Sequence, residues 1–324
     1  MRALQAAGVA ASAAAGTHTF IRALEFWLPN AERSLLEYGG GLHAPGSQMA
    51  RTSREMCFGF GEGLPGRAWE LGEPVVLHAF EGSYFKRTAA AHAEGLSCGI
   101  AVPIFLGDYL SSVVVFFCGD DEHHAGAIEV WKNDPAASKD MTLADGHYGR
   151  TGDTFEFISR RTSFRPGTGL PGLAWLQRAP VFLPDLGRGS GFLRDDGAVK
   201  VGINRGLALP CATPGRSQFV LALLSALGTP LARRVEIWRP DFSGQALALQ
   251  SGFCETSGVL TDTVATLALG QGSVGRCWLT GLPGVTTNLA SEPGAASAAH
   301  GLSSLFVMPM LNEARFVAAV ALYF

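Results

Sequence analysis

Short apolar runs, separated by glycine and proline, recur along the whole chain. The runs 127–131 and 235–238 are rich in β-branched and aromatic residues, which is typical of strands. The segments 99–105 and 111–117 predict two further strands, joined by Gly107-Asp108. The segments 67–71 and 84–94 predict short helices, because a glycine suited to a helix end follows each of them.

The same pattern occurs three times, with a period of about 100 residues. A glycine-rich turn ending in tryptophan occurs at Gly61–Trp69, Gly167–Trp175 and Gly270–Trp278. A proline follows each tryptophan by five residues, at Pro74, Pro180 and Pro283. A Glu-x-Trp motif lies upstream, at Glu25, Glu129 and Glu236, and a glycine stands eight residues before a proline downstream, at Pro103, Pro210 and Pro309. These landmarks predict three units, 17–125, 126–232 and 233–324.

Each unit is expected to be an α+β structure with an antiparallel sheet and short helices. Its elements follow the order strand, strand, helix, strand, helix, strand, strand, which differs from the βαβ alternation of a parallel sheet. In Gly-Leu-Pro-Gly, glycine permits a tight turn and proline suits the first turn of a helix. Because they follow this turn on short helices that face a sheet, Trp69, Trp175 and Trp278 are expected to be buried.

This order and its landmarks resemble the GAF domain, a small sensory module. The resemblance covers nearly the whole chain, with unit 3 degenerate. Unit 1 is most similar to the GAF-like region of nodule-inception-like plant transcription factors, which have a Gly-Leu-Pro-Gly-Arg turn and a Gly-x-Ala-x-Pro strand in the same order. The chain has no room for a DNA-binding output domain and no basic recognition segment, so direct binding of nucleic acid is not expected.

The long flanking helices of tandem GAF domains have no place in this sequence. The linkers after residues 118 and 226 are about eight residues long, too short for such a helix plus turns. The face that these helices would cover must be covered by a neighbouring repeat, a protein partner or a second copy. We therefore expect a compact rod or cluster of three units that unfolds as a whole.

Composition excludes several classes of protein. The chain is 47% apolar and 16% charged with a net charge of -3, which argues against a surface devoted to nucleic acid or anionic membrane. No apolar run reaches the ~18 residues of a membrane helix. The six cysteines are spread singly, as expected of reduced thiols in a cytoplasmic protein. Residues 1–16 are expected to be a disordered tail or a weak targeting peptide.

Two arginines in equivalent places suggest an anion site. Arg87 and Arg194 each lie sixteen residues before the repeated proline, where the resemblance implies the wall of a ligand pocket. A guanidinium there could clamp a carboxylate, phosphate or nitrate, or it could be an exposed helix arginine paired with an acid. Neighbouring candidate ligand-binding residues are Tyr84, His92 and Ser97 in unit 1, and Arg188, Lys200, Asn204 and Arg205 in unit 2. Unit 2 has a surplus of positive charge and is expected to bind an anion best.

The resemblance implies a non-catalytic sensory or regulatory protein that binds a small anionic ligand, needs no cofactor and signals through protein contacts. An interaction scaffold of degenerate units is the alternative, and filled interiors near Arg87 and Arg194 would favour it. An enzyme alternative, a thiol-based reductase of free methionine sulfoxide, would use Cys57, Cys98 and Cys118, but His92 stands where its nucleophile belongs. The His123-His124 pair predicts an acidic solvated turn in preference to a metal site.

Overall fold

Three antiparallel sheets, each formed by one continuous stretch of the chain, make up the protein. The computed structural model describes residues 19–119, 126–187, 189–226, 228–260, 265–293, 301–313 and 315–324. The strands of the first sheet lie between residues 23 and 118, those of the second between 126 and 226, and those of the third between 234 and 323. Each sheet therefore falls inside one of the three predicted units. The tail 1–16 and the His123-His124 pair lie outside the described residues.

Unit 1 shows the arrangement most fully. Its elements are β1 (Ala23–Pro29), β2 (Leu35–Leu42), α1 (Gln48–Arg54), β3 (Cys57–Gly59), α2 (Gly63–Leu71), β4 (Val75–Leu77), α3 (Thr88–Ala93), β5 (Cys98–Leu106) and β6 (Tyr109–Cys118). The sheet order is β3-β2-β1-β6-β5-β4, so the first and last strands of the unit lie side by side at its centre.

Units 2 and 3 repeat this topology. Unit 2 contains β7 (Gly126–Asn133), β8 (Met141–His147), η1 (Gly149–Thr151), α4 (Gly152–Arg161), β9 (Ser163–Phe164), α5 (Gly169–Gln177), β10 (Val181–Leu183), α6 (Asp195–Lys200), β11 (Ile203–Cys211) and β12 (Gln218–Ala226). Unit 3 contains β13 (Arg234–Pro240), β14 (Ala246–Cys254), β15 (Gly258–Val259), β16 (Thr266–Ala268), α7 (Gly272–Thr280), β17 (Gly284–Thr286), η2 (Leu289–Ser291), β18 (Leu305–Asn312) and β19 (Arg315–Tyr323). The central pairs are β7 with β12 and β13 with β19. The predicted α+β class with antiparallel sheets is confirmed.

Both predicted helices of unit 1 have different bounds in the structure. The helix expected at 67–71 begins at Gly63, because Pro65 lies within its first turn and suits that position. The helix expected at 84–94 spans only Thr88–Ala93. Arg87 is its N-cap residue, and Arg194 has the same place before α6.

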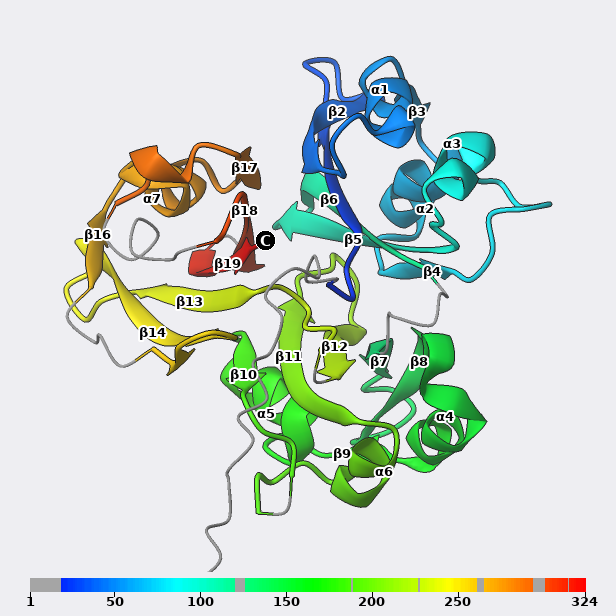
Figure 1. Cartoon of the computed structure of the whole chain (residues 1–324), viewed down its shortest axis with the longest axis vertical. Coiled ribbons are helices and arrows are strands. Elements are labelled where there is room, and N and C mark those ends of the chain that lie inside the picture. The colour runs from blue at the N-terminus through cyan, green and yellow to red at the C-terminus, as the bar shows by residue number, and fades with distance from the viewer. Residues whose placement is uncertain are drawn as a thin grey trace, which may run out of the picture.

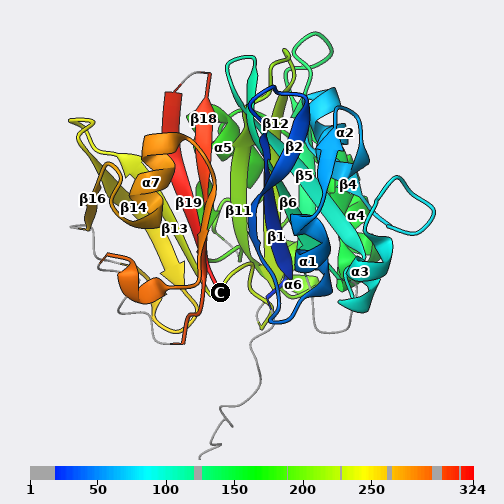
Figure 2. The same ribbon diagram turned by 90° about the horizontal axis from the view of Figure 1, so that it is seen from above.

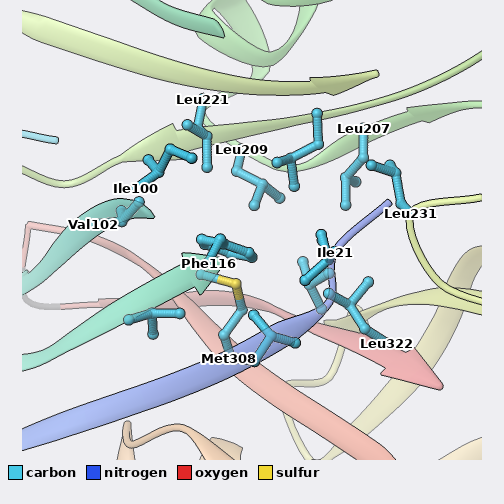
Figure 3. Close-up of a cluster of buried hydrophobic side chains, with 14 of the residues drawn as sticks. Ile21, Ile100, Val102, Phe116, Leu207, Leu209, Leu221, Leu231, Met308 and Leu322 are labelled. Atoms are coloured by element: carbon cyan, nitrogen blue, oxygen red, sulfur yellow. The ribbon is translucent and has the colours of Figure 1, made fainter. Parts of the chain in front are cut away.

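The three sheets surround a common centre, and the helices lie on their outer sides (Figures 1 and 2). One buried core lies at this centre and draws on all three units. Figure 3 shows Phe116 of unit 1, Leu221 of unit 2 and Met308 of unit 3 pointing toward one another there. The faces that lack flanking helices are thus covered by neighbouring repeats, and the arrangement is a cluster.

A second core in each unit lies between the sheet and its helices, and strand tryptophans occupy it. Trp27, Trp131 and Trp238 are at most 2% exposed. The helix tryptophans 69, 175 and 278 are half-buried and pack against these outer cores, so the prediction that they are buried holds only in part. They lie at the rim, where Trp69 contacts the exposed ring of Phe60 with ring centroids 5.3 Å apart.

Candidate functional site

A buried glutamate stands at the same place on the first strand of every unit. Glu25, Glu129 and Glu236 are completely buried. Because side chains two residues apart on a strand share a face, each lies beside the tryptophan of its Glu-x-Trp motif. The indole N–H donates to the carboxylate over 3.2 Å in unit 1, 2.9 Å in unit 2 and 2.8 Å in unit 3. An ionised carboxylate in such a place needs a cationic partner.

Arg87 is that partner in unit 1. Its Nη1 lies 2.7 Å from Oε1 and 2.6 Å from Oε2 of Glu25. Ser53, on α1, donates to Oε1 over 2.5 Å, and the His43 ring lies 3.4 Å from the same oxygen. Burial by itself raises the pKa of Glu25, but the attraction of Arg87, with hydrogen bonds from His43 and Arg87, outweighs it and lowers the pKa to about 2.

Arg194 makes a two-pronged contact in unit 2. Its Nη1 lies 2.5 Å from Oε1 of Glu129 and its Nη2 lies 2.8 Å from Oε2. Tyr148 donates its hydroxyl to Oε1 over 3.0 Å, and Ser159 also contacts Arg194. Burial opposes ionisation, yet Arg194 holds the pKa of Glu129 below its usual value. Burial and the nearby Glu129 charge raise the pKa of Tyr148, which therefore stays a neutral donor.

Unit 3 reaches the same charge balance by a different route. Pro293 occupies the sequence position of the helix arginine, and Arg234 on β13 takes over its role. Its Nε donates to Oε1 of Glu236 over 2.6 Å. Tyr323 donates to Oε2 over 2.9 Å, as Tyr148 does in unit 2. Each buried carboxylate thus has one arginine and one tryptophan donor.

The predicted ligand-binding residues are divided among different surroundings. Arg87 and Arg194 face inward, as a pocket wall requires, but each holds a carboxylate of its own unit. Arg205 instead pairs with Glu255 of unit 3, with 2.7 Å between Nε and Oε1. The remaining candidates are Tyr84, His92 and Lys200, which are exposed, Ser97 and Asn204, which are partly buried, and Arg188, which lies outside the described residues.

The interior charge is therefore balanced without a ligand. Arg194 and Glu129 neutralise each other, so the surplus positive charge counted along residues 188–205 is not concentrated at Arg194. Of the buried nitrogens of Arg87 and Arg194, three have no hydrogen-bond partner among the described residues: Arg87 Nε, Arg87 Nη2 and Arg194 Nε. These N–H groups could donate hydrogen bonds to a small polar molecule. A second anion would instead meet an arginine–glutamate pair with no net charge.

Sequence reasoning missed the importance of the repeated glutamates. They were recognised as landmarks of the repeat, but their burial and pairing were not anticipated. The available signal was a charged residue in the middle of an apolar strand in all three units. The serines that complete the cluster, Ser53 and Ser159, carry no comparable signal.

The three cysteines of unit 1 do not all lie together in the described part of the chain. Cys57 lies on β3, which is three strands from β6 and Cys118, about 14 Å at the usual strand spacing. Cys98 and Cys118 are cross-strand neighbours inside the central core. Across the described residues, no group of three His, Cys, Asp or Glu residues is placed to hold a metal. No described helix has the length and apolar character needed to cross a membrane.

Two pockets, of about 350 and 360 Å³, lie where units meet. Neither is lined by Arg87 or Arg194. Both include the loop 213–217 between β11 and β12. The open space described here thus lies between units, away from the buried glutamates.

No protein-family model and no curated protein matches this chain. Among solved structures it is similar to the nlh2 GAF domain of A. aeolicus, with 18% identity and a TM-score of 0.25, covering 32% of this chain and 60% of that one. It is also similar to the GAF domain/HD domain protein of Geobacter sulfurreducens, with 17% identity and a TM-score of 0.27, covering 33% and 66%. A third neighbour is an NreA protein of Staphylococcus aureus mutated in its nitrate binding site, with 14% identity and a TM-score of 0.26, covering 31% and 72%.

The chain spans less than two thirds of the A. aeolicus and Geobacter chains, and each match covers about one third of this chain. The resemblance to GAF domains predicted from the motifs agrees with these neighbours. The particular similarity of unit 1 to plant transcription factors finds no support among them.

Proposed function

We propose that this chain is a non-catalytic regulatory protein in which three GAF-like units form a closed interaction scaffold. One observation carries the proposal: a carboxylate, an arginine and a tryptophan of the same unit meet inside every unit, and the arginine balances the buried charge of the carboxylate. Filled interiors favour a scaffold over a set of open ligand pockets.

Electrostatics supports the closed interior. An external anion at Arg194 would have to displace Glu129, which is fixed on the central strand β7 and completely buried. Breaking a buried ion pair by removing one partner typically costs about 3–5 kcal/mol, because the other charge stays buried. The hydrogen bonds of a small anion to one arginine, about 1.5–3 kcal/mol each, are together of the same size as that cost, so the exchange leaves little net binding free energy.

The shared central core supports a scaffold role as well. It fixes the three units relative to one another, so their outer helices and loops are held in a constant arrangement (Figure 1). A rigid platform of this kind suits a protein that acts by holding partners, and the output would be a protein–protein contact.

A second candidate is a small ligand in the interior of unit 1. It is favoured by Nε and Nη2 of Arg87, two buried donors without a partner. A compact neutral molecule with a hydrogen-bond acceptor would satisfy them and leave the Arg87–Glu25 pair intact. This candidate keeps the sensory role that the sequence resemblance implies.

Arg194→Ala separates a scaffold from an anion sensor. For a scaffold, calorimetry with nitrate, phosphate and acetate shows no saturable binding to the wild type, and the variant loses about 3–5 kcal/mol of unfolding free energy. For a sensor, the wild type binds one of these anions and the variant binds it tenfold to a hundredfold more weakly. Lys139→Ala, at an exposed lysine of the same unit that is not among the candidate ligand-binding residues, is the control and should change neither property.

A further inference from the structure

The 350 Å³ pocket lies where the connecting loops of the three long strand pairs meet. Asp108 comes from the β5–β6 turn of unit 1, Arg216 from the β11–β12 loop of unit 2, and Glu313 from the β18–β19 turn of unit 3. The N–H of Gly107 donates to the carbonyl of Glu313 over 3.0 Å, which joins two of these turns directly. The pocket therefore exists only in the assembled three-unit structure.

Unit 2 departs from the repeat at this place. Only two residues separate β5 from β6 and β18 from β19, whereas residues 212–217 separate β11 from β12. The longer loop adds Arg216 to the pocket and lines a large part of its wall. Among the three equivalent loops, the one in unit 2 is the longest, and it contributes residues 212–217 to the pocket.

The end of α5 departs from the repeat as well. The residue after the equivalent helix is Gly72 in unit 1 and Gly281 in unit 3, both left-handed with φ of 64° and 66°. In unit 2 it is Arg178, with φ of 49°, a conformation that residues with a side chain rarely adopt. Its side chain lines the pocket. Strained residues of this kind are concentrated at binding sites, where the side chain is needed.

Four charged residues line the pocket. Arg178 and Arg216 come from unit 2, and Asp108 and Glu313 come from units 1 and 3. None of the four takes part in an ion pair or a side-chain hydrogen bond within the described chain, and all are exposed. The rings of Phe105 and Trp175 also line the pocket, and the indole N–H of Trp175 is already satisfied by Gln218.

We propose that this pocket binds a small zwitterion, namely a free α-amino acid with an apolar side chain. Its carboxylate would pair with Arg178 and Arg216, its ammonium group with Asp108 and Glu313, and its side chain would lie on the two rings. A simple anion would meet the two acids, and a simple cation would meet the two arginines. The volume corresponds to roughly a dozen water molecules, enough for leucine or phenylalanine. This inference goes beyond the scaffold role and does not depend on it.

Calorimetry on the full chain tests the ligand class. L-leucine and L-phenylalanine are expected to bind saturably. The probes 4-methylpentanoate and 3-methylbutylamine, each of which keeps one charge of leucine, are expected to bind at least about tenfold more weakly. Absence of saturable binding by both amino acids, or equal binding of a single-charge probe, overturns the proposal.

Arg178→Gly tests the site itself. The variant restores the residue that units 1 and 3 have at this position, so its melting temperature should equal or exceed that of the wild type. Its affinity for L-leucine should fall by about tenfold or more. Lys139→Ala, at an exposed lysine of unit 2 that does not line the pocket, should bind like the wild type. Unchanged affinity in Arg178→Gly overturns the proposal, whereas the anion titration of Arg194→Ala tests the scaffold role separately.

Discussion

The buried glutamates are the residues on which the interior of each unit depends. A carboxylate that is completely buried on a central strand is tolerated only because arginine, tryptophan and serine or tyrosine donors surround it. Unit 3 shows that the buried glutamate requires an arginine beside it, but that this arginine can come from a different element. There Arg234, on the same strand as Glu236, replaces the helix arginine.

Acid should therefore weaken unit 1 through Glu25. Its pKa is about 2 in the folded protein and 4.5 in the unfolded chain, so its ionisation contributes stability above pH 4.5 that is lost as the pH falls toward 2. The full contribution is about 3 kcal/mol. The difference in unfolding free energy between wild type and Glu25→Gln, measured by urea titration, should shrink over this range. A difference that stays constant from pH 7 to pH 2.5 would contradict the assignment.

At this scale the sequence located the arginines but not their partners. The spacing to Pro103 and Pro210 placed Arg87 and Arg194 in equivalent positions and left open whether they face inward or are exposed; the structure shows both buried. Their partners lie 62 and 65 residues earlier in the chain. A pairing over that distance depends on how α3 and α6 pack on the sheet, which residue spacing alone does not specify.

Among the elements, the glycine-rich turn and the helix that follows it are the most constrained. The second glycine of Gly-Leu-Pro-Gly, and its counterpart in unit 3, lies against a backbone carbonyl of the preceding segment. A Cβ atom would stand 2.1 Å from Gly59 O at Gly66, 2.2 Å from Arg165 O at Gly172 and 2.5 Å from Ala268 O at Gly275. The repeat thus keeps glycine here because the helix must approach the backbone closely.

Gly172→Ala should accordingly destabilise the protein. The new methyl group meets backbone atoms that cannot rotate away, and overpacking of this kind costs about 1–3 kcal/mol or more. The matched control is Gly215→Ala, since no heavy atom lies within 4 Å of a Cβ atom there. Thermal unfolding should show a lower melting temperature for Gly172→Ala alone. Equal melting temperatures for both variants would mean that the close approach is not maintained in solution.

Sequence patterns predicted the long strands and overlooked the smallest elements. Between the second strand and the glycine-rich turn, unit 1 also contains α1 and β3, and unit 2 contains α4 and β9. Helix α1 has only seven residues and little apolar periodicity. It is held instead by its cap, where Ala50 N–H donates to Ser47 Oγ over 2.9 Å, and by Glu94, which accepts from Met49 N–H over 2.8 Å. The contact with Glu94 joins residues 45 positions apart, so it leaves no local pattern in the sequence.

For the whole molecule, the absence of flanking helices predicted that the sheet faces left uncovered would be covered by neighbouring repeats or a partner. The sheets of the three units pack on one another through the central core (Figure 3). Polar contacts cross the same boundaries: His78 Nε2 lies 2.9 Å from Asp145 Oδ1, and Lys132 Nζ lies 3.3 Å from Glu73 Oε2. A cluster and a rod were both compatible with the short linkers, because linker length limits the distance between units without fixing their orientation.

Because the core is shared, a cavity in one unit should destabilise all three together. Met308 is completely buried among residues of units 1 and 2, so Met308→Ala should cost about 2–5 kcal/mol. Leu267→Ala, in the outer core of unit 3, is the companion variant. Urea unfolding would be followed by NMR through the indole N–H signal of Trp27 in unit 1, so that every tryptophan stays in place. Cooperative unfolding predicts that both substitutions in unit 3 shift the Trp27 transition to lower urea. If the units unfold independently, Leu267→Ala leaves that transition where it is, because Leu267 belongs to a core cluster made of residues of unit 3.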